Sequence, residues 1–197
     1  MTKDVNKNRI QVFLIFYIFL WVTLNAFILT FFPFVHSDET WLAGITKTML
    51  DEGSIAVTEP FFDLQPRTVH ALRLIFHAVQ ALFQGILGYS VVGFRALSLF
   101  AGGLSLVLFF FLLKRLGFLS RYAFLGVVLL SLDIQFLYAS HFGRQEIFLV
   151  VFMLGGLIAV LGPGGGEGAE TKIFPDLPRG IAAGCITGLA LGVHPNA

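Results

Sequence analysis

Long apolar runs alternate with short polar segments along the chain. The first run covers residues 10–32, and its length of about 23 residues is enough to cross the hydrocarbon core of a bilayer. Lys3, Lys7 and Arg9 precede this run, which favours a cytoplasmic amino terminus. The run is longer than the apolar core of a signal peptide, and no small-x-small cleavage site follows it. We therefore expect a retained membrane anchor.

Four further apolar runs predict four further membrane spans. They cover residues 90–113, 122–138, 147–161 and 180–193. Lys114, Arg115 and Arg121 lie between the second and third spans, so this hairpin is expected on the cytoplasmic side. Residues 33–89 then form an outer loop, and residues 162–179 form a glycine-rich cytoplasmic linker. We expect the whole chain to be the amino-terminal transmembrane part of a larger protein.

The outer loop contains a first segment that is typical of a helix lying along the membrane surface. Its apolar residues recur at helical spacing, and polar residues oppose them. These apolar residues are Trp41, Leu42, Ile45, Met49 and Leu50. Gly53 is placed to end this helix, because glycine readily adopts the left-handed conformation found at helix C-termini.

A second surface helix is expected at residues 68–85. Its polar residues form one stripe on an otherwise apolar cylinder. The stripe consists of His70, Arg73, His77, Gln80 and Gln84. A membrane-spanning placement would put Arg73 in lipid, at a cost of about 2.5–3.5 kcal/mol for a central arginine, and an interfacial helix avoids that cost. The stripe is then either a solvated helix face without chemistry or part of a site at the membrane surface.

Composition agrees with a membrane architecture. Hydrophobic residues make up 56% of the chain and charged residues 13%, and the mean hydropathy is +0.84, which excludes an ordinary soluble domain. The net charge of +1 gives no support for nucleic-acid binding. The single cysteine, Cys185, cannot form an intrachain disulfide. The expected fold class is an all-α polytopic membrane protein with two interfacial helices in its first extracytoplasmic loop.

This arrangement collects the polar clusters at one extracytoplasmic rim. They comprise Asp38, Glu39, His70, Arg73, His77, Arg95, His141, Arg144, Glu146, His194 and Asn196. Asp133 is the exception, because a rise of about 1.5 Å per residue puts it about 12 Å inside the outer end of the third span. Carboxylates inside a membrane are costly, so Asp133 is either functional or held by a buried partner such as Gln135 or Ser131.

The adjacent carboxylates Asp38 and Glu39 carry the candidate chemistry. Neighbouring side chains point in different directions, so only one of the two can face a given reacting atom. This arrangement suits a general base with an orienting partner better than an acid–base pair. An adjacent Asp-Glu in a loop is, on its own, most often solvated surface.

The order of these motifs resembles that of a known enzyme family. A first span is followed by the Asp38-Glu39 loop, a surface helix ending in Met-Leu-x-x-Gly, and a proline before the second surface helix. An Arg-Ala-Leu-Ser span start, a basic hairpin and an Arg-x-Glu loop come next. The chain is similar to the polytopic GT-C glycosyltransferases that use lipid-phosphate sugars, namely the protein mannosyltransferases and the aminoarabinose transferases of lipid A. The likeness extends over nearly the whole chain.

The resemblance implies both a fold and an activity. The fold would be the amino-terminal half of a GT-C enzyme. The activity would be transfer of a sugar from a polyprenyl-phosphate donor to a hydroxyl of a lipid, glycan or protein acceptor, on the extracytoplasmic side of the cell membrane. A single base on the face opposite the leaving group implies inversion of configuration, by analogy with inverting glycosidases.

Matching positions imply roles for individual residues. Asp38 matches the loop aspartate that the family places beside the acceptor, and it is the expected general base. Glu39 matches its acidic neighbour, and Arg95 matches an active-site arginine that could hold Glu39. Arg144 and Glu146 match a polar pair between the third and fourth spans.

The donor phosphate is expected to meet cations near the same rim. The aminoarabinose enzymes have a lysine before the loop proline, where this chain has Gln65-Pro66, and Arg67 is a candidate substitute. The expected phosphate-binding residues are Arg67, His70, Arg73 and Arg144. His194 is a further candidate, because it stands where relatives often carry Thr-Lys-Gly.

No metal or other cofactor is expected, because the outer loop lacks an Asp-x-Asp motif. His36, Asp38 and Glu39 would bind a divalent ion only adventitiously. Two other functions fit parts of the pattern. A secondary transporter would show an internal repeat and broken helices with polar residues at mid-membrane. A non-catalytic membrane subunit would bind the same lipid without needing Asp38.

Overall fold

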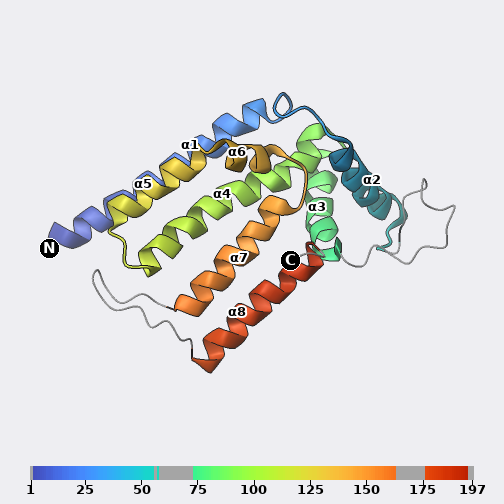
Figure 1. Cartoon of the computed structure of the whole chain (residues 1–197). Helices are drawn as coiled ribbons and strands as arrows, with labels where there is room; N and C mark the ends of the chain where they lie inside the picture. Colours follow the sequence, from blue (N-terminus) through green and yellow to red (C-terminus); the bar gives the residue numbers. More distant parts are fainter. Residues whose placement is uncertain (1, 56, 58–72, 163–175, 195–197) are drawn as a thin grey trace.

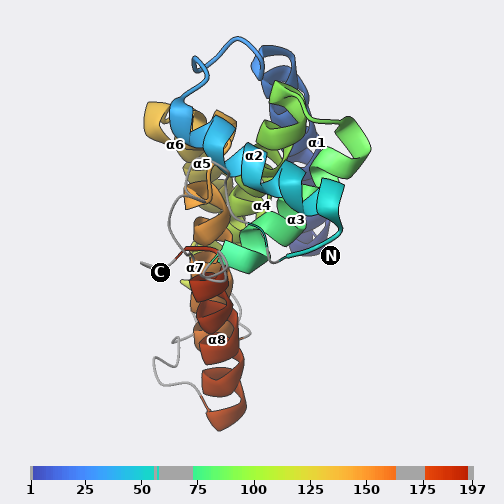
Figure 2. The same cartoon turned by 90° about the vertical axis from the view of Figure 1, so that its right-hand side faces the viewer.

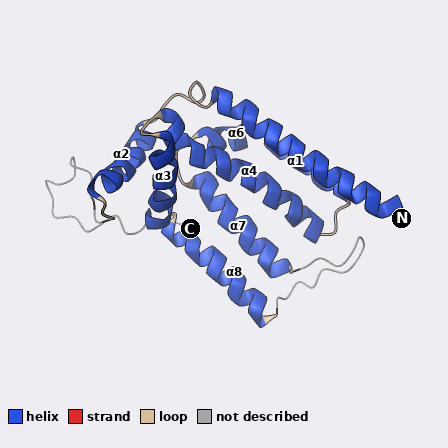
Figure 3. Ribbon diagram, turned by 180° about the vertical axis from the view of Figure 1, so that it is seen from behind, coloured by secondary structure: helices blue, strands red, loops and turns tan. Residues whose placement is uncertain are grey.

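The protein folds into a bundle of helices, seen in a computed structural model (Figure 1) that describes residues 2–55, 57, 73–162 and 176–194. The helices are α1 (Thr2–Ile28), α2 (Ser37–Glu52), α3 (Leu74–Leu87), α4 (Val91–Arg115), α5 (Ser120–Ser131), α6 (Ile134–His141), α7 (Glu146–Leu161), α8 (Leu177–Leu189) and the 3-10 turn η3 (Ala190–Gly192). Every regular element in the described ranges is helical (Figure 3). The all-α fold class is therefore confirmed.

Helix α4 lies at the centre of the bundle. It packs against α1, α3, α5, α6 and α7, and α7 in turn packs against α8. Consecutive long helices run in opposite directions, and α2 and α3 lie across one end of the bundle (Figures 1 and 2). We call this the α2 end, formed by α2, α3 and residues 142–145. The start of α1 and the turn between α4 and α5 lie at the opposite end.

Within the part of the chain that the structure describes, two helices are long and apolar enough to cross a membrane. They are α1 from Arg9 and α4 over its whole length, and the bent α5–α6 pair makes a third if it is one span. Helices α7 and α8 are apolar but shorter, so the spans expected at 147–161 and 180–193 stay predictions. Helix α1 exposes large apolar side chains, including Val12, Phe13, Phe16, Phe19 and Phe27. Such a surface suits contact with lipid rather than water.

The helix expected over residues 122–138 is broken. Helices α5 and α6 meet at a bend of 67°, and Asp133 caps α6 by accepting a hydrogen bond from the Phe136 amide at 2.9 Å. The carbonyl of Ser131, in the last turn of α5, accepts a bond from the Trp21 indole at 3.1 Å. A helix end frees such carbonyls, which need other partners. Asp133 is exposed and bonds to the Phe136 amide rather than to Gln135 or Ser131, so the expected buried side-chain partner is wrong, while its depth in a membrane stays a prediction.

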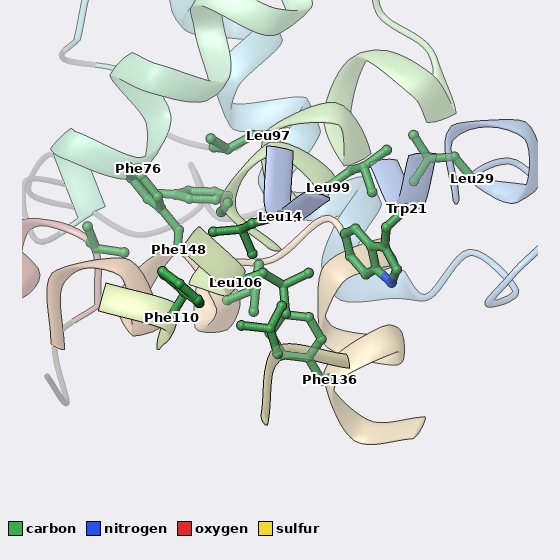
Figure 4. Packing of buried hydrophobic residues seen from close by; sticks show 14 of the residues in the cluster. Leu14, Trp21, Leu29, Phe76, Leu97, Leu99, Leu106, Phe110, Phe136 and Phe148 are labelled. Atoms are coloured by element: carbon green, nitrogen blue, oxygen red, sulfur yellow. The ribbon is translucent and has the colours of Figure 1, made fainter. Parts of the chain in front are cut away.

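Small residues allow α4 to approach its neighbours closely. A side chain at Gly102 would lie 2.5 Å from the Ser140 hydroxyl, and one at Gly103 would lie 2.9 Å from Val22. Small residues at helix contacts are typical of membrane bundles. The core around these contacts is apolar and includes Trp21, Leu106, Phe110, Phe136 and Phe148 (Figure 4).

The polar stripe of α3 faces inward. His77, Gln80 and Gln84 are buried, whereas Leu82 and Ile86 are 64% and 82% exposed. The Thr46 hydroxyl of α2 lies 2.8 Å from His77 Nδ1 and 2.5 Å from Gln80 Oε1. Buried polar groups need such partners. Of the two alternatives for the stripe, a solvated helix face is therefore wrong for these three residues, while the interfacial placement of α2 and α3 stays a prediction.

Candidate active site

The first turn of α2 sets the directions of the two adjacent carboxylates. His36 caps this helix: its Nδ1 accepts from the Asp38 amide at 3.3 Å, and the Glu39 carboxylate accepts from the His36 amide at 3.0 Å. This reciprocal capping box fixes the start of the helix. Successive residues then project about 100° apart. Glu39 points into the protein with no exposed area, whereas the Asp38 side chain is 46% exposed.

Glu39 forms a buried ion pair with Arg95, the fifth residue of α4. Arg95 Nε donates to Glu39 Oε1 at 2.8 Å, and Arg95 Nη2 donates to Oε2 at 2.8 Å. Arg95 Nη1 also donates to the carbonyls of Leu29 and Pro33, at 2.9 and 2.8 Å. Neither charged side chain is exposed. Separating such a pair by removing one partner costs about 3–5 kcal/mol, because the other charge stays buried.

The loop between α6 and α7 is tied to this pair. The Gly143 amide donates to Glu39 Oε1 at 2.5 Å, and the Ser98 hydroxyl donates to the Arg144 carbonyl at 3.3 Å. A side chain at Gly143 would lie 2.7 Å from the Phe94 ring and 3.1 Å from Glu39. Only glycine fits this approach without displacing a neighbour. The buried pair therefore positions the backbone that carries Arg144.

Arg144 connects the two exposed carboxylates of the site. Its Nη1 lies 3.3 Å from Asp38 Oδ2, and its Nη2 lies 2.8 Å from Glu146 Oε1. The guanidinium also lies 5.5 Å from the centre of the Phe142 ring. The three charged side chains are between 30% and 47% exposed, so they are accessible to solvent. We call Asp38, Arg73, Arg144 and Glu146 the rim cluster.

Arg73 is the second cation of the rim cluster. It precedes α3, and its guanidinium lies 5.2 Å from the centre of the Trp41 ring, which is a cation–π contact. Burial lowers the pKa of Arg73, and the Arg144 charge lowers it further, while Glu146 and Asp38 raise it. Arginine stays protonated in proteins. The two guanidiniums therefore repel each other, and an anion placed between them would relieve that repulsion.

The other candidates from the sequence are Arg67, His70, Asp133 and His194. Arg67 and His70 belong to the segment that the structure does not describe. Asp133 bonds to the α6 backbone. His194 follows η3, whose Gly192 packs against Ile75 in the first turn of α3.

Three residues that contribute to the geometry of the site were not assigned to it from the sequence. Trp41 was placed on the apolar face of α2, Gly143 was not singled out, and His36 was considered only as an adventitious ligand. His36 Nδ1 lies 3.9 Å from Asp38 Oδ1. The signal for Trp41 was its position three residues after Asp38, which puts it on a neighbouring part of the helix surface. Within the described ranges, no three His, Cys, Asp or Glu residues are grouped to hold a metal ion.

Comparison with known proteins identifies a family that this chain matches. The family model described as dolichyl-phosphate-mannose-protein mannosyltransferase matches residues 76–193, more than half of the chain. No curated protein and no solved structure matches. The matched range contains Arg95, Arg144 and Glu146. Arg95 contacts Glu39 and Arg144 contacts Asp38, two carboxylates that precede the range. This match favours a transferase over a transporter. The chain belongs to the dolichyl-phosphate-mannose-protein mannosyltransferase family of membrane glycosyltransferases.

Proposed function

We propose that this protein transfers mannose from a polyprenyl-phosphate-mannose donor, such as dolichyl-phosphate-mannose, to a hydroxyl group of a protein acceptor. The family description names this type of donor and acceptor, which favours a protein over a lipid or glycan acceptor. The observation that carries the proposal is the rim cluster. It combines an accessible carboxylate, Asp38, with an arginine 3.3 Å away, the two kinds of group that this reaction needs.

Asp38 is the proposed general base. The carboxylate takes the proton from the acceptor hydroxyl, and the hydroxyl oxygen attacks C1 of the mannose from the face opposite the phosphate. The bond between C1 and the phosphate oxygen breaks, and the phosphate leaves with the electron pair. A single displacement of this kind inverts the configuration at C1.

Arg144 and Arg73 are the proposed phosphate-binding cations. Arginine donates paired hydrogen bonds to phosphate oxygens, and these charge-assisted bonds stabilise the charge that develops on the leaving group. Arg67 and His70, outside the described residues, are proposed to add to this site. Glu39 and Arg95 are proposed as positioning residues, because they are fully buried and hold the loop that carries Arg144.

The α2 end is proposed to face the extracytoplasmic side, with α2 and α3 along the membrane surface. Lys114, Arg115 and Arg121 lie at the opposite end, and such residues concentrate in cytoplasmic loops. Single cysteines placed at Leu116 and Glu52, in a protein with Cys185→Ala, test this topology. We expect an impermeant thiol reagent to label position 52 from outside and position 116 only after permeabilisation. The reverse pattern would overturn the assignment.

The activity is tested by transfer of labelled mannose from dolichyl-phosphate-mannose to an acceptor peptide, with the protein in liposomes. We expect transfer by the wild type and a loss of about 10²-fold or more in Asp38→Asn, which keeps shape but removes the base. Asp51→Asn is the matched control, because Asp51 is an exposed carboxylate at the far end of the same helix. Full activity in Asp38→Asn would contradict the assignment of Asp38 as the general base. Lipid binding without transfer by the wild type would instead indicate a non-catalytic subunit.

A further inference from the structure

Arg144 is shared between two carboxylates in the rim cluster. One nitrogen of its guanidinium contacts Asp38 at 3.3 Å, and another contacts Glu146 at 2.8 Å. The remaining nitrogen, Nε, is buried and has no hydrogen-bond partner among the described residues. The four charged groups of the rim cluster, two carboxylates and two guanidiniums, balance one another. Any reaction that moves negative charge within this cluster must also redistribute its cations.

The proposed transfer moves one negative charge through this cluster. When the acceptor O–H bond breaks, its proton neutralises the Asp38 carboxylate. When the bond between C1 and the phosphate oxygen breaks, the electron pair converts a phosphate diester with one negative charge into a monoester with two. The total charge is unchanged, but one negative charge has passed from Asp38 to the phosphate.

We propose that Arg144 is a counterion shared by the base and the leaving group, so that proton uptake by Asp38 releases Arg144 to the departing phosphate. This inference rests on the proposed function. The Asp38–Arg144 contact is partly exposed and 3.3 Å long, so it is a weak ion pair. In an arginine–phosphate contact, the guanidinium donates two parallel, charge-assisted hydrogen bonds to the phosphate oxygens. The exchange is therefore favourable once Asp38 is protonated.

Glu146 and Arg73 have distinct roles in this exchange. The 2.8 Å contact with Glu146 keeps the Arg144 guanidinium within the rim cluster while its Asp38 partner changes. Arg73 stays over the Trp41 ring and supplies a fixed second cation. The shared counterion couples the two halves of the reaction, because the phosphate gains its full counter-charge only when the acceptor has lost its proton.

Binding of the leaving group tests this coupling. The probe is a short-chain polyprenyl monophosphate, titrated into the protein in nanodiscs, with the matching polyprenol as the uncharged control. Asp38→Asn mimics the neutral base and should bind the monophosphate about three- to fivefold more tightly, a range set by the modest strength of partly exposed ion pairs. Asp38→Ala is a second neutral variant and should behave alike. Binding of polyprenol should not change.

The effect of Asp38→Asn on monophosphate affinity is also measured in an Arg144→Ala background. This shows whether the gain in affinity depends on Arg144. If Asp38 competes with phosphate for Arg144, removal of Asp38 gives no gain when Arg144 is absent, which makes the two substitutions strongly non-additive. An equal gain with and without Arg144 would mean simple charge repulsion and would overturn the inference. No gain in either background would also overturn it. Asp51→Asn should leave binding unchanged.

Different results would contradict the proposed function and the shared-counterion hypothesis. Wild-type mannose transfer by Asp38→Asn would remove Asp38 as the base, and the coupling with it. Loss of transfer combined with unchanged monophosphate affinity would leave the base in place and overturn only the shared counterion. Loss of transfer combined with an Arg144-dependent gain in affinity is the result that we expect.

Discussion

Asp38 and Glu39 are neighbours in sequence, and each pairs with an arginine from elsewhere in the chain. The Glu39–Arg95 pair is unexposed, bidentate and tied to the backbone of Leu29, Pro33 and Gly143. The Asp38–Arg144 pair is partly exposed and makes a single contact at 3.3 Å.

This difference arises at the first turn of α2, where adjacent residues point in different directions. The start of α2 turns Glu39 toward α4 and leaves Asp38 at the surface. A buried charge that is fully bonded cannot exchange partners without a large cost, so it suits a structural role. An accessible charge with a weak partner can give and take protons, so it suits chemistry. We therefore propose that two neighbouring carboxylates, each paired with an arginine, have different roles because one pair is buried and the other is accessible.

The largest effect is expected from breaking the buried pair. Glu39→Gln keeps the shape of the side chain but leaves Arg95 charged and uncompensated, at a cost of about 3–5 kcal/mol. For a chain of this size such a loss lowers Tm by roughly 10 °C. Thermal unfolding in nanodiscs measures it. The double variant Glu39→Gln, Arg95→Met should lose less than the sum of the single variants, and strict additivity would contradict a coupled pair.

A smaller effect is expected from removing the exposed partner. Arg144→Ala should lower kcat/KM for the donor by about 10- to 100-fold, since a hydrogen bond to a charged group contributes about 1.5–3 kcal/mol. Its Tm should change little, because the side chain is partly exposed. Steady-state kinetics with varied donor concentration provide the measurement. A large fall in Tm with an unchanged kcat/KM would assign Arg144 to the scaffold instead.

The connection between the two pairs predicts an intermediate phenotype for Gly143→Ala. The new methyl group would press on Phe94 and Glu39, so the loop must shift, at about 1–3 kcal/mol for overpacking. We expect a moderate loss of both Tm and turnover. Gly44→Ala in α2 is the control, since no atom lies within 4 Å of the added carbon. Equal behaviour of the two variants would argue against a tight contact at Gly143.

The smallest effect is expected from the Lys47–Asp51 pair on the exposed part of α2. Partly exposed pairs four residues apart in a helix contribute about 0.3–0.5 kcal/mol. Lys47→Ala should therefore leave Tm and transfer within error of the wild type. A clear loss of transfer would show that this surface also takes part in function.

Helix content and the position of the site were readable from the sequence. Apolar run length and basic flanks predicted helices that alternate in direction, and Gly53 was expected to end α2. The structure has Gly53 in the left-handed conformation at that end. The same threading predicted that Asp38, Arg144 and Glu146 share one end of the bundle, and their contacts bring them together.

Burial and helix breaks were not readable in the same way. The sequence left open whether the stripe on α3 faces solvent or belongs to a site. In the structure the apolar face of α3 is exposed, and its polar face turns toward α2, where Thr46 bonds to it. Asp133 was read as a charge within a continuous helix. Its role as a helix cap depends on the bend between α5 and α6, which hydropathy does not reveal.

The decisive measurement is the transfer rate and Tm of Asp38→Asn and Glu39→Gln, determined side by side in the same nanodiscs. Our account predicts that Asp38→Asn loses about 10²-fold or more in turnover and keeps the Tm of the wild type. It predicts that Glu39→Gln loses roughly 10 °C in Tm and only part of its turnover at temperatures where it stays folded. Wild-type turnover in Asp38→Asn, or an unchanged Tm in Glu39→Gln with turnover abolished, would contradict the division of roles between the two carboxylates.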